Sequence, residues 1–144
     1  MSVTDRRPPF RFAVRTRVGF DETDAQGIVY YGRYMPYFDR ARVEYLRHLG
    51  LLQPESGGAE FVMRAQHVEY HAPARFDDEL EVFVRVRRLG RTSVTWEFEA
   101  WNAVSDEHLA TSTQTAVYVA ARTPVRVNDA VREAVVAFDR AVES

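Results

Sequence analysis

The chain has 144 residues, no cysteine and a formal net charge of −2. This length fits one domain whose core needs no disulfide or metal. The lack of cysteine excludes disulfides, thiolate metal sites and a cysteine nucleophile, and the charge argues against a general nucleic-acid binder. The start carries no signal-type apolar segment, and no apolar run approaches about 18 residues, so we expect a cytoplasmic protein without a membrane span.

Residues 10–20 alternate as a half-buried strand does. Arginines at positions 11, 15 and 17 are predicted to face solvent. The apolar residues predicted to share the inner face are Phe10, Phe12, Val14, Val18 and Phe20. A period of two over this length is typical of a strand with one face on a core.

The period changes to that of a helix between Arg33 and Leu49. Apolar residues recur there every three or four positions, and Gly50 follows as a C-terminal glycine commonly does. Pro36 fits only the first helical turn, where no amide donor is needed. The helix is therefore expected to begin at residues 33–35.

Four more strands are predicted from later runs of strand-like residues. They span residues 61–71, 79–89, 92–102 and 108–121. A Pro- and Gly-rich loop at residues 53–60 precedes them. The connections between the last three are short, which makes these strands antiparallel neighbours.

The C-terminal part has the spacing of a second, shorter helix over about 128–142. Asn128 is its candidate N-cap. The apolar residues at helical spacing are Val131, Val135, Phe138 and Val142. We expect one α+β domain over residues 1–144, with a core of about 10–121, in which a five-stranded antiparallel sheet wraps the long helix. Its unpaired edges predict self-association as a homodimer or homotetramer.

Asp21, Glu22 and Asp24 stand just before the glycine and apolar residues that lead into the long helix. Amides at a helix start lack intrahelical partners and favour negative charge, so they can hold a carbonyl oxygen as it becomes an oxyanion. A carboxylate beside them could attack that carbonyl or activate a water, and a thioester suits this chemistry because thiolate leaves well. The alternative is that Asp21 and Asp24 only cap a turn.

The stretch "DETDAQGIVYYGRYMPYFDRARVEYLR" resembles the signature of the 4-hydroxybenzoyl-CoA thioesterase family, especially its YbgC-like acyl-CoA thioesterase branch. The matching residues are Thr23, Asp24, Ala25, Gly27, Val29, Tyr30, Tyr34, Ala41, Arg42, Glu44 and Leu46. The stretches "VEYHAPARFDDELEV" and "RVRRLGRTSVTW" also look like the family's later strands, so the likeness covers residues of about 10–121. It implies a hotdog fold, in which two subunits form active sites at their interface.

The resemblance also implies roles for residues of the opening motif. Asp24 aligns with the family's catalytic aspartate, acting as nucleophile or as general base on water. The backbone amide of Tyr31 aligns with the oxyanion donor. Gly27 would permit close approach of the thioester, or it is only a turn glycine. Many YbgC-like members carry histidine at position 31, so an imidazole role is lost here while backbone donation survives.

Further residues are candidates for holding the rest of an acyl-CoA. By the resemblance, Arg88, Arg91 and Ser93 are the candidates for phosphate contacts, since arginine and hydroxyl donors suit phosphate oxygens and the family often places such contacts here. The alternative is a solvated hairpin. Tyr34 is the candidate for lining an acyl pocket, although an aromatic run at a helix start is also typical of core or subunit interface.

The predicted function is hydrolysis of an acyl- or aroyl-CoA to free acid and CoA. No cofactor is expected, because CoA is part of the substrate. No metal is expected either, since His67 and His71, with Glu69 between them, lack a third ligand pattern. One alternative is a hotdog hydratase or dehydratase, for which the opening motif lacks a histidine. The other is a non-catalytic acyl-CoA-binding module, which would gain little from Asp24.

Overall fold

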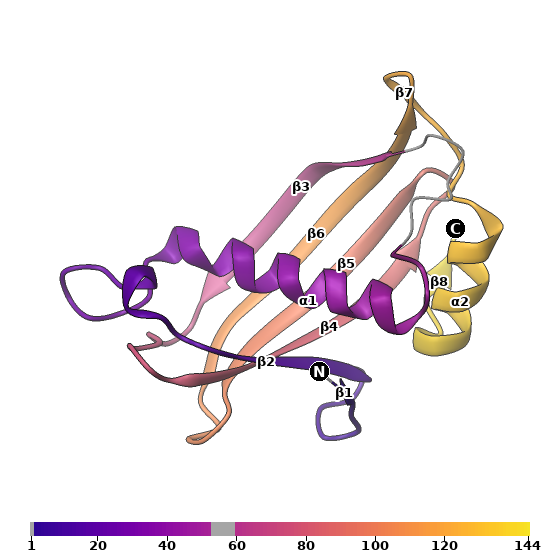
Figure 1. Cartoon of the computed structure of the whole chain (residues 1–144). Helices are drawn as coiled ribbons and strands as arrows, with labels where there is room; N and C mark the ends of the chain where they lie inside the picture. Colours follow the sequence, from indigo (N-terminus) through magenta and orange to yellow (C-terminus); the bar gives the residue numbers. More distant parts are fainter. Residues whose placement is uncertain (1, 53–59) are drawn as a thin grey trace.

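A computed structural model describes residues 2–52 and 60–144. Figure 1 shows a sheet crossed on one side by a long helix, with a short helix at the C-terminal end. The predicted α+β organisation is confirmed. Nearly all of the predicted loop at residues 53–60 lies outside the described residues. None of the described helices is both long and apolar enough to cross a membrane.

Five long strands form the sheet, in the spatial order β2, β4, β5, β6, β3, and each is antiparallel to its neighbours. Their bounds are Phe12–Arg17 (β2), Glu60–Tyr70 (β3), Glu79–Leu89 (β4), Ser93–Asn102 (β5) and His108–Ala120 (β6). Three two-residue segments extend it: Ser2–Val3 (β1), Thr123–Pro124 (β7) and Val142–Glu143 (β8). The prediction of five antiparallel strands holds for the long strands, while β8 runs parallel to β4.

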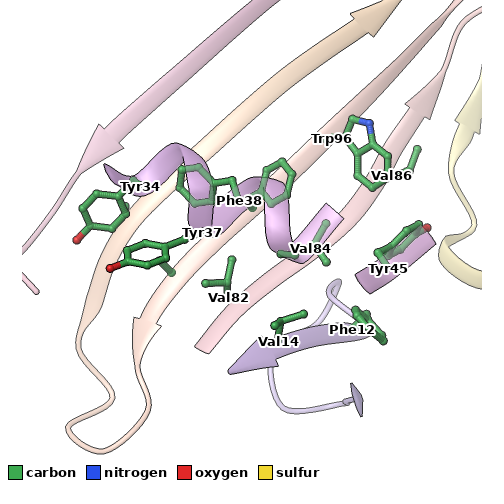
Figure 2. Packing of buried hydrophobic residues seen from close by; sticks show 14 of the residues in the cluster. Phe12, Val14, Tyr34, Tyr37, Phe38, Tyr45, Val82, Val84, Val86 and Trp96 are labelled. Carbon is green, nitrogen blue, oxygen red and sulfur yellow. The ribbon is translucent and has the colours of Figure 1, made fainter. Parts of the chain in front are cut away.

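The helix α1 (Tyr34–His48) begins and ends where the sequence predicts, with Pro36 in its first turn. Its buried residues recur at three- and four-residue spacing and lie against the inner face of the sheet (Figure 2). The buried apolar ones are Tyr34, Tyr37, Phe38, Ala41 and Tyr45. Each fully buried large apolar side chain contributes roughly 1.5–3 kcal/mol, so this face holds the helix in place.

Two of the five residues predicted on the inner face of the first strand lie elsewhere. Phe10 packs with Ala13 and Phe83 in a small separate cluster. Phe20 is 77% exposed in the 3-10 turn η1 (Phe20–Glu22). The prediction was wrong for both because the alternation in the sequence runs past the ends of β2, which covers only residues 12–17.

The C-terminal helix α2 (Asp129–Asp139) ends earlier than predicted. Its N-cap is confirmed, since the Asn128 side chain accepts a hydrogen bond of 2.9 Å from the Val131 amide. Arg140 then takes a left-handed conformation, with φ of 54°, and stops the helix. Val142 therefore lies not on the helix but in β8, where it pairs with Arg88.

A buried carboxylate joins the end of α2 to α1 and to β4. The Oδ2 atom of Asp139 accepts hydrogen bonds from the Tyr45 hydroxyl and, at 2.9 Å, from the Val86 amide. The pairing of β4 with β5 shifts register between Val86 and Arg88, at the point where Asp139 takes up the Val86 amide. Burial raises the pKa of Asp139, and the two hydrogen bonds only partly offset it.

The raised pKa predicts how Asp139→Asn changes stability with pH. The folded state binds the Asp139 proton more tightly than the unfolded state does. The stability that this protonated carboxyl contributes is therefore lost as the pH rises from its ordinary pKa of 3.8 through the raised pKa. Asparagine can accept the same two hydrogen bonds without the charge. Urea unfolding between pH 4 and 7 should therefore show the free energy of unfolding of the variant rising relative to that of the wild type as the pH increases. The total change should be roughly 1.4 kcal/mol for each pH unit by which folding raises this pKa. A constant difference across that range would contradict this account.

Candidate active site

The loop before α1 is built around a tight turn at residues 24–27, at the left of Figure 1. The Asp24 carbonyl accepts a hydrogen bond from the Gly27 amide at 3.0 Å, and the Asp24 amide donates to the Ile28 carbonyl at 2.9 Å. Gly27 has φ of +75°, the left-handed region that glycine enters without steric cost. A Cβ at this position would meet nothing within 4 Å, so the backbone conformation, not crowding within the protomer, requires the glycine.

The turn fixes the Asp24 carboxylate. Its Oδ1 atom accepts a hydrogen bond of 2.8 Å from the Gln26 amide, the pattern of an Asx turn. The side chain is exposed in the single protomer. One oxygen is thus held by the chain's own backbone, and the other has no partner among the residues that the structure describes.

Backbone hydrogen bonds attach this loop to the segment before β4. The Val29 amide donates to the Ala74 carbonyl at 2.8 Å, and Ile28 forms a bridge with Arg75. Ala74 is fully buried and belongs to the same core cluster as Tyr34. Burial raises the pKa of Tyr34 to about 12, so this hydroxyl stays neutral. The loop and the first turn of α1 therefore share one support.

The amide of Tyr31 is a backbone donor that directly follows the loop. This residue begins the 3-10 turn η2 (Tyr31–Arg33), which runs directly into α1. The carbonyl of Tyr30 accepts a hydrogen bond of 2.8 Å from the Arg33 amide, which fixes the peptide between Tyr30 and Tyr31. The N–H of that peptide has no acceptor within residues 2–52 and 60–144. A held peptide with an unused N–H is the arrangement that an oxyanion donor requires.

The tyrosines around the turn differ in exposure. Tyr30 and Tyr31 are 46% and 62% exposed, and their ring centroids lie 4.4 Å apart. Tyr34, the candidate for the acyl pocket, is only 2% exposed and packs against Tyr37 and Phe38 in the core, as Figure 2 shows. Of Tyr30, Tyr31 and Tyr34, only the first two present a ring that a ligand can reach in one protomer.

The structure does not bring Arg88, Arg91 and Ser93 near Asp24 within one protomer. They lie at the connection between β4 and β5, beside α2. Asp24 is attached instead to the segment just before β4, and the steps from Glu79 to Arg88 span about 30 Å of strand. Arg91 is exposed, and the Arg88 Nε atom donates to the Ser144 hydroxyl at 3.1 Å.

His67 and His71, the histidines considered as metal ligands, contact other side chains. His67 pairs with the Glu69 carboxylate at 3.3 Å on the exposed strand β3. His71 Nε2 lies 2.9 Å from the Thr111 hydroxyl. In the part of the chain that the structure describes, no group of three or more His, Cys, Asp or Glu side chains is placed to hold a metal ion.

Sequence reasoning missed three contacts that shape the site. Ala74 supports the loop, the Glu22 carbonyl accepts from the Tyr30 amide at 3.1 Å, and the Tyr70 hydroxyl donates to the Tyr31 carbonyl at 3.1 Å. Two of these contacts use only backbone atoms, which leave no trace in the residue type. Tyr70 ends a strand, and only the folded chain brings it to Tyr31.

An antiparallel sheet that wraps one long helix in this strand order is the hotdog fold. In this chain a loop that carries the Asp24 carboxylate precedes the helix. The model of one family, the Thioesterase superfamily, matches residues 26–107. The match covers more than half of the chain, so the protein belongs to this superfamily and is a thioesterase.

Relatives and solved structures agree with this assignment. The chain is 40% identical over 96 residues to Acyl-CoA thioester hydrolase YbgC of Escherichia coli O6:H1. The aligned residues cover 65% of this chain and 70% of the relative. A structure from Aquifex aeolicus described as a hypothetical protein has a TM-score of 0.80 and 32% identity, covering 86% of this chain and 98% of that one. A thioesterase from Thermus thermophilus, complexed with coenzyme A and Zn, has a TM-score of 0.80 and 28% identity, covering 93% and 98%.

Proposed function

We propose that this protein hydrolyses acyl- or aroyl-CoA thioesters to free acid and CoA, using Asp24 and the Tyr31 amide. One observation carries the proposal. A carboxylate fixed by a turn precedes, by seven residues, a held peptide whose N–H is unused among the described residues. The names of the relatives, acyl-CoA thioester hydrolases, supply the substrate class.

In the proposed reaction the thioester oxygen accepts a hydrogen bond from the Tyr31 N–H. The Asp24 carboxylate either attacks the thioester carbon or takes a proton from a water that attacks it. In both cases the carbonyl oxygen gains negative charge, and one backbone donor commonly contributes about 10²–10³ in rate at this stage. The C–S bond then breaks and CoA leaves as thiolate. After direct attack by Asp24, water cleaves the resulting anhydride and restores the carboxylate.

A hydratase or dehydratase fits the site less well. Such enzymes typically pair a histidine with a carboxylate, and the loop from Asp24 to Tyr31 contains none. His71 follows Tyr70 in the chain, but its Nε2 atom lies 2.9 Å from the Thr111 hydroxyl and its ring packs on that of His108 at 4.5 Å between centroids. The site therefore favours hydrolysis, for which the carboxylate and the backbone donor suffice.

We also propose that the active protein is a homodimer or homotetramer with sites shared between subunits. The edge strand β3 is exposed along nearly its whole length and presents Phe61, Val62 and Met63. An unpaired apolar edge favours pairing with a second copy. Two-fold antiparallel pairing through β3 would place the partner's β4–β5 connection at the end of the sheet where Asp24 lies. A cytoplasmic location is likewise a proposal, supported by the lack of cysteine.

Asp24→Asn tests the catalytic proposal. The amide keeps the hydrogen bond from Gln26 but can neither attack nor accept a proton, so kcat should fall by about 10²–10⁴-fold while binding of the acyl-CoA changes little. A free-thiol assay measures turnover, and no cysteine of the protein interferes. The matched control is Asp21→Asn, an exposed carboxylate three positions earlier, which should keep its activity within about twofold. Equal losses in the two variants would refute the assignment.

Arg91→Gln tests the proposed contact with the CoA phosphates. Losing one exposed charged contact should raise the KM for acyl-CoA by about 3- to 10-fold and leave kcat unchanged. The matching acyl-pantetheine lacks the nucleotide and its phosphates, so its kinetics should be the same for variant and wild type. The contact is disproved if both substrates respond alike or if neither responds.

A further inference from the structure

A hydroxyl from the edge strand reaches the turn that carries the proposed oxyanion donor. Tyr70 is the last residue of β3, and its Oη atom donates to the Tyr31 carbonyl at 3.1 Å. The same carbonyl accepts from the amide of Tyr34. Residues 39 positions apart in the chain are thus joined at η2.

The ring of Tyr70 packs at the same corner. Its centroid lies 6.3 Å from that of Tyr31 and 5.5 Å from that of Tyr34, in edge-to-face arrangements. Tyr34 is buried in the core, whereas Tyr31 is exposed. Tyr70 therefore links an exposed ring to one that α1 and the sheet hold in place.

The hydrogen bond from Tyr70 differs from the others within η2. The bonds from Arg33 to Tyr30 and from Tyr34 to Tyr31 lie inside the turn and would move with it as a unit. The bond from Tyr70 comes from the sheet, so it fixes where the turn points relative to the sheet. The peptide on each side of the Tyr31 Cα atom is then held through its carbonyl, which limits rotation of the Tyr31 N–H.

We propose that Tyr70 is a positioning residue for hydrolysis, which rests on the proposed function of the Tyr31 amide. Its hydroxyl holds the carbonyl of Tyr31 and thereby keeps the N–H of that residue aimed at the thioester oxygen. Tyr70 belongs to β3, the strand proposed to pair with a second subunit. One strand would therefore serve both assembly and the positioning of the oxyanion donor. Tyr70 itself takes no proton and forms no bond in the reaction.

Tyr70→Phe tests the inference because it removes the hydroxyl and keeps the ring. The expected result is a fall in kcat of about 3- to 10-fold, the range for one lost neutral hydrogen bond. KM should stay within about twofold, and so should the affinity for a CoA thioether, which has no carbonyl oxygen to stabilise. The matched control is Tyr118→Phe on the neighbouring strand β6, where the ring stacks on Phe61 with 6.2 Å between centroids; this variant should behave as wild type.

Three outcomes would overturn the inference. One is unchanged kcat in Tyr70→Phe. Another is a rise in KM and weaker thioether binding with kcat preserved, which would make Tyr70 a binding residue. The third is a smaller species on size-exclusion chromatography whose activity returns at higher protein concentration, which would place the effect in assembly. Asp24→Asn, measured alongside, separates failure of this inference from failure of the proposed site, because an active Asp24→Asn would refute the proposed role of Asp24.

Discussion

The site depends on the hydrogen bond between the Val29 amide and the Ala74 carbonyl. Asp24 is exposed on a loop, and the attachment of that loop to a fully buried residue helps to define its position relative to Tyr31. Ala74 and Tyr34, the latter in the first turn of α1, belong to the same buried cluster. The burial of one helix face thus sets the place of the carboxylate and of the backbone donor at once.

The groups proposed to act on an acyl-CoA divide between two ends of the sheet. The Asp24 carboxylate and the Tyr31 amide lie before α1, and the candidate phosphate ligands Arg88, Arg91 and Ser93 lie beside α2. Between these ends the strand β3 is open along its outer edge. In the proposed function a single protomer therefore presents parts of a site, and pairing of two copies would combine them.

Much of the fold could be predicted because α1 and the long strands carry strong periodicity, and all of them except the exposed strand β3 bury a face that the sequence marks. The errors fall where an element stops: Phe10 and Phe20 continue the pattern of β2 beyond its ends, and Val142 continues that of α2 beyond Arg140. The motif around Asp24 and Tyr31 could be recognised by resemblance. Ala74 and Tyr70 could not, because their roles arise from contacts that exist only after distant segments fold together.

The most direct test of the central claim is a crystal structure of the Asp24→Asn protein with an intact acyl-CoA bound. The account predicts that the thioester oxygen lies about 2.7–3.1 Å from the Tyr31 nitrogen. It also predicts that the thioester carbon lies about 3–3.5 Å from the attacking oxygen's position, which is either the side chain of residue 24 or a water hydrogen-bonded to it. A thioester whose oxygen points away from the Tyr31 amide, or that binds far from residue 24, would contradict it.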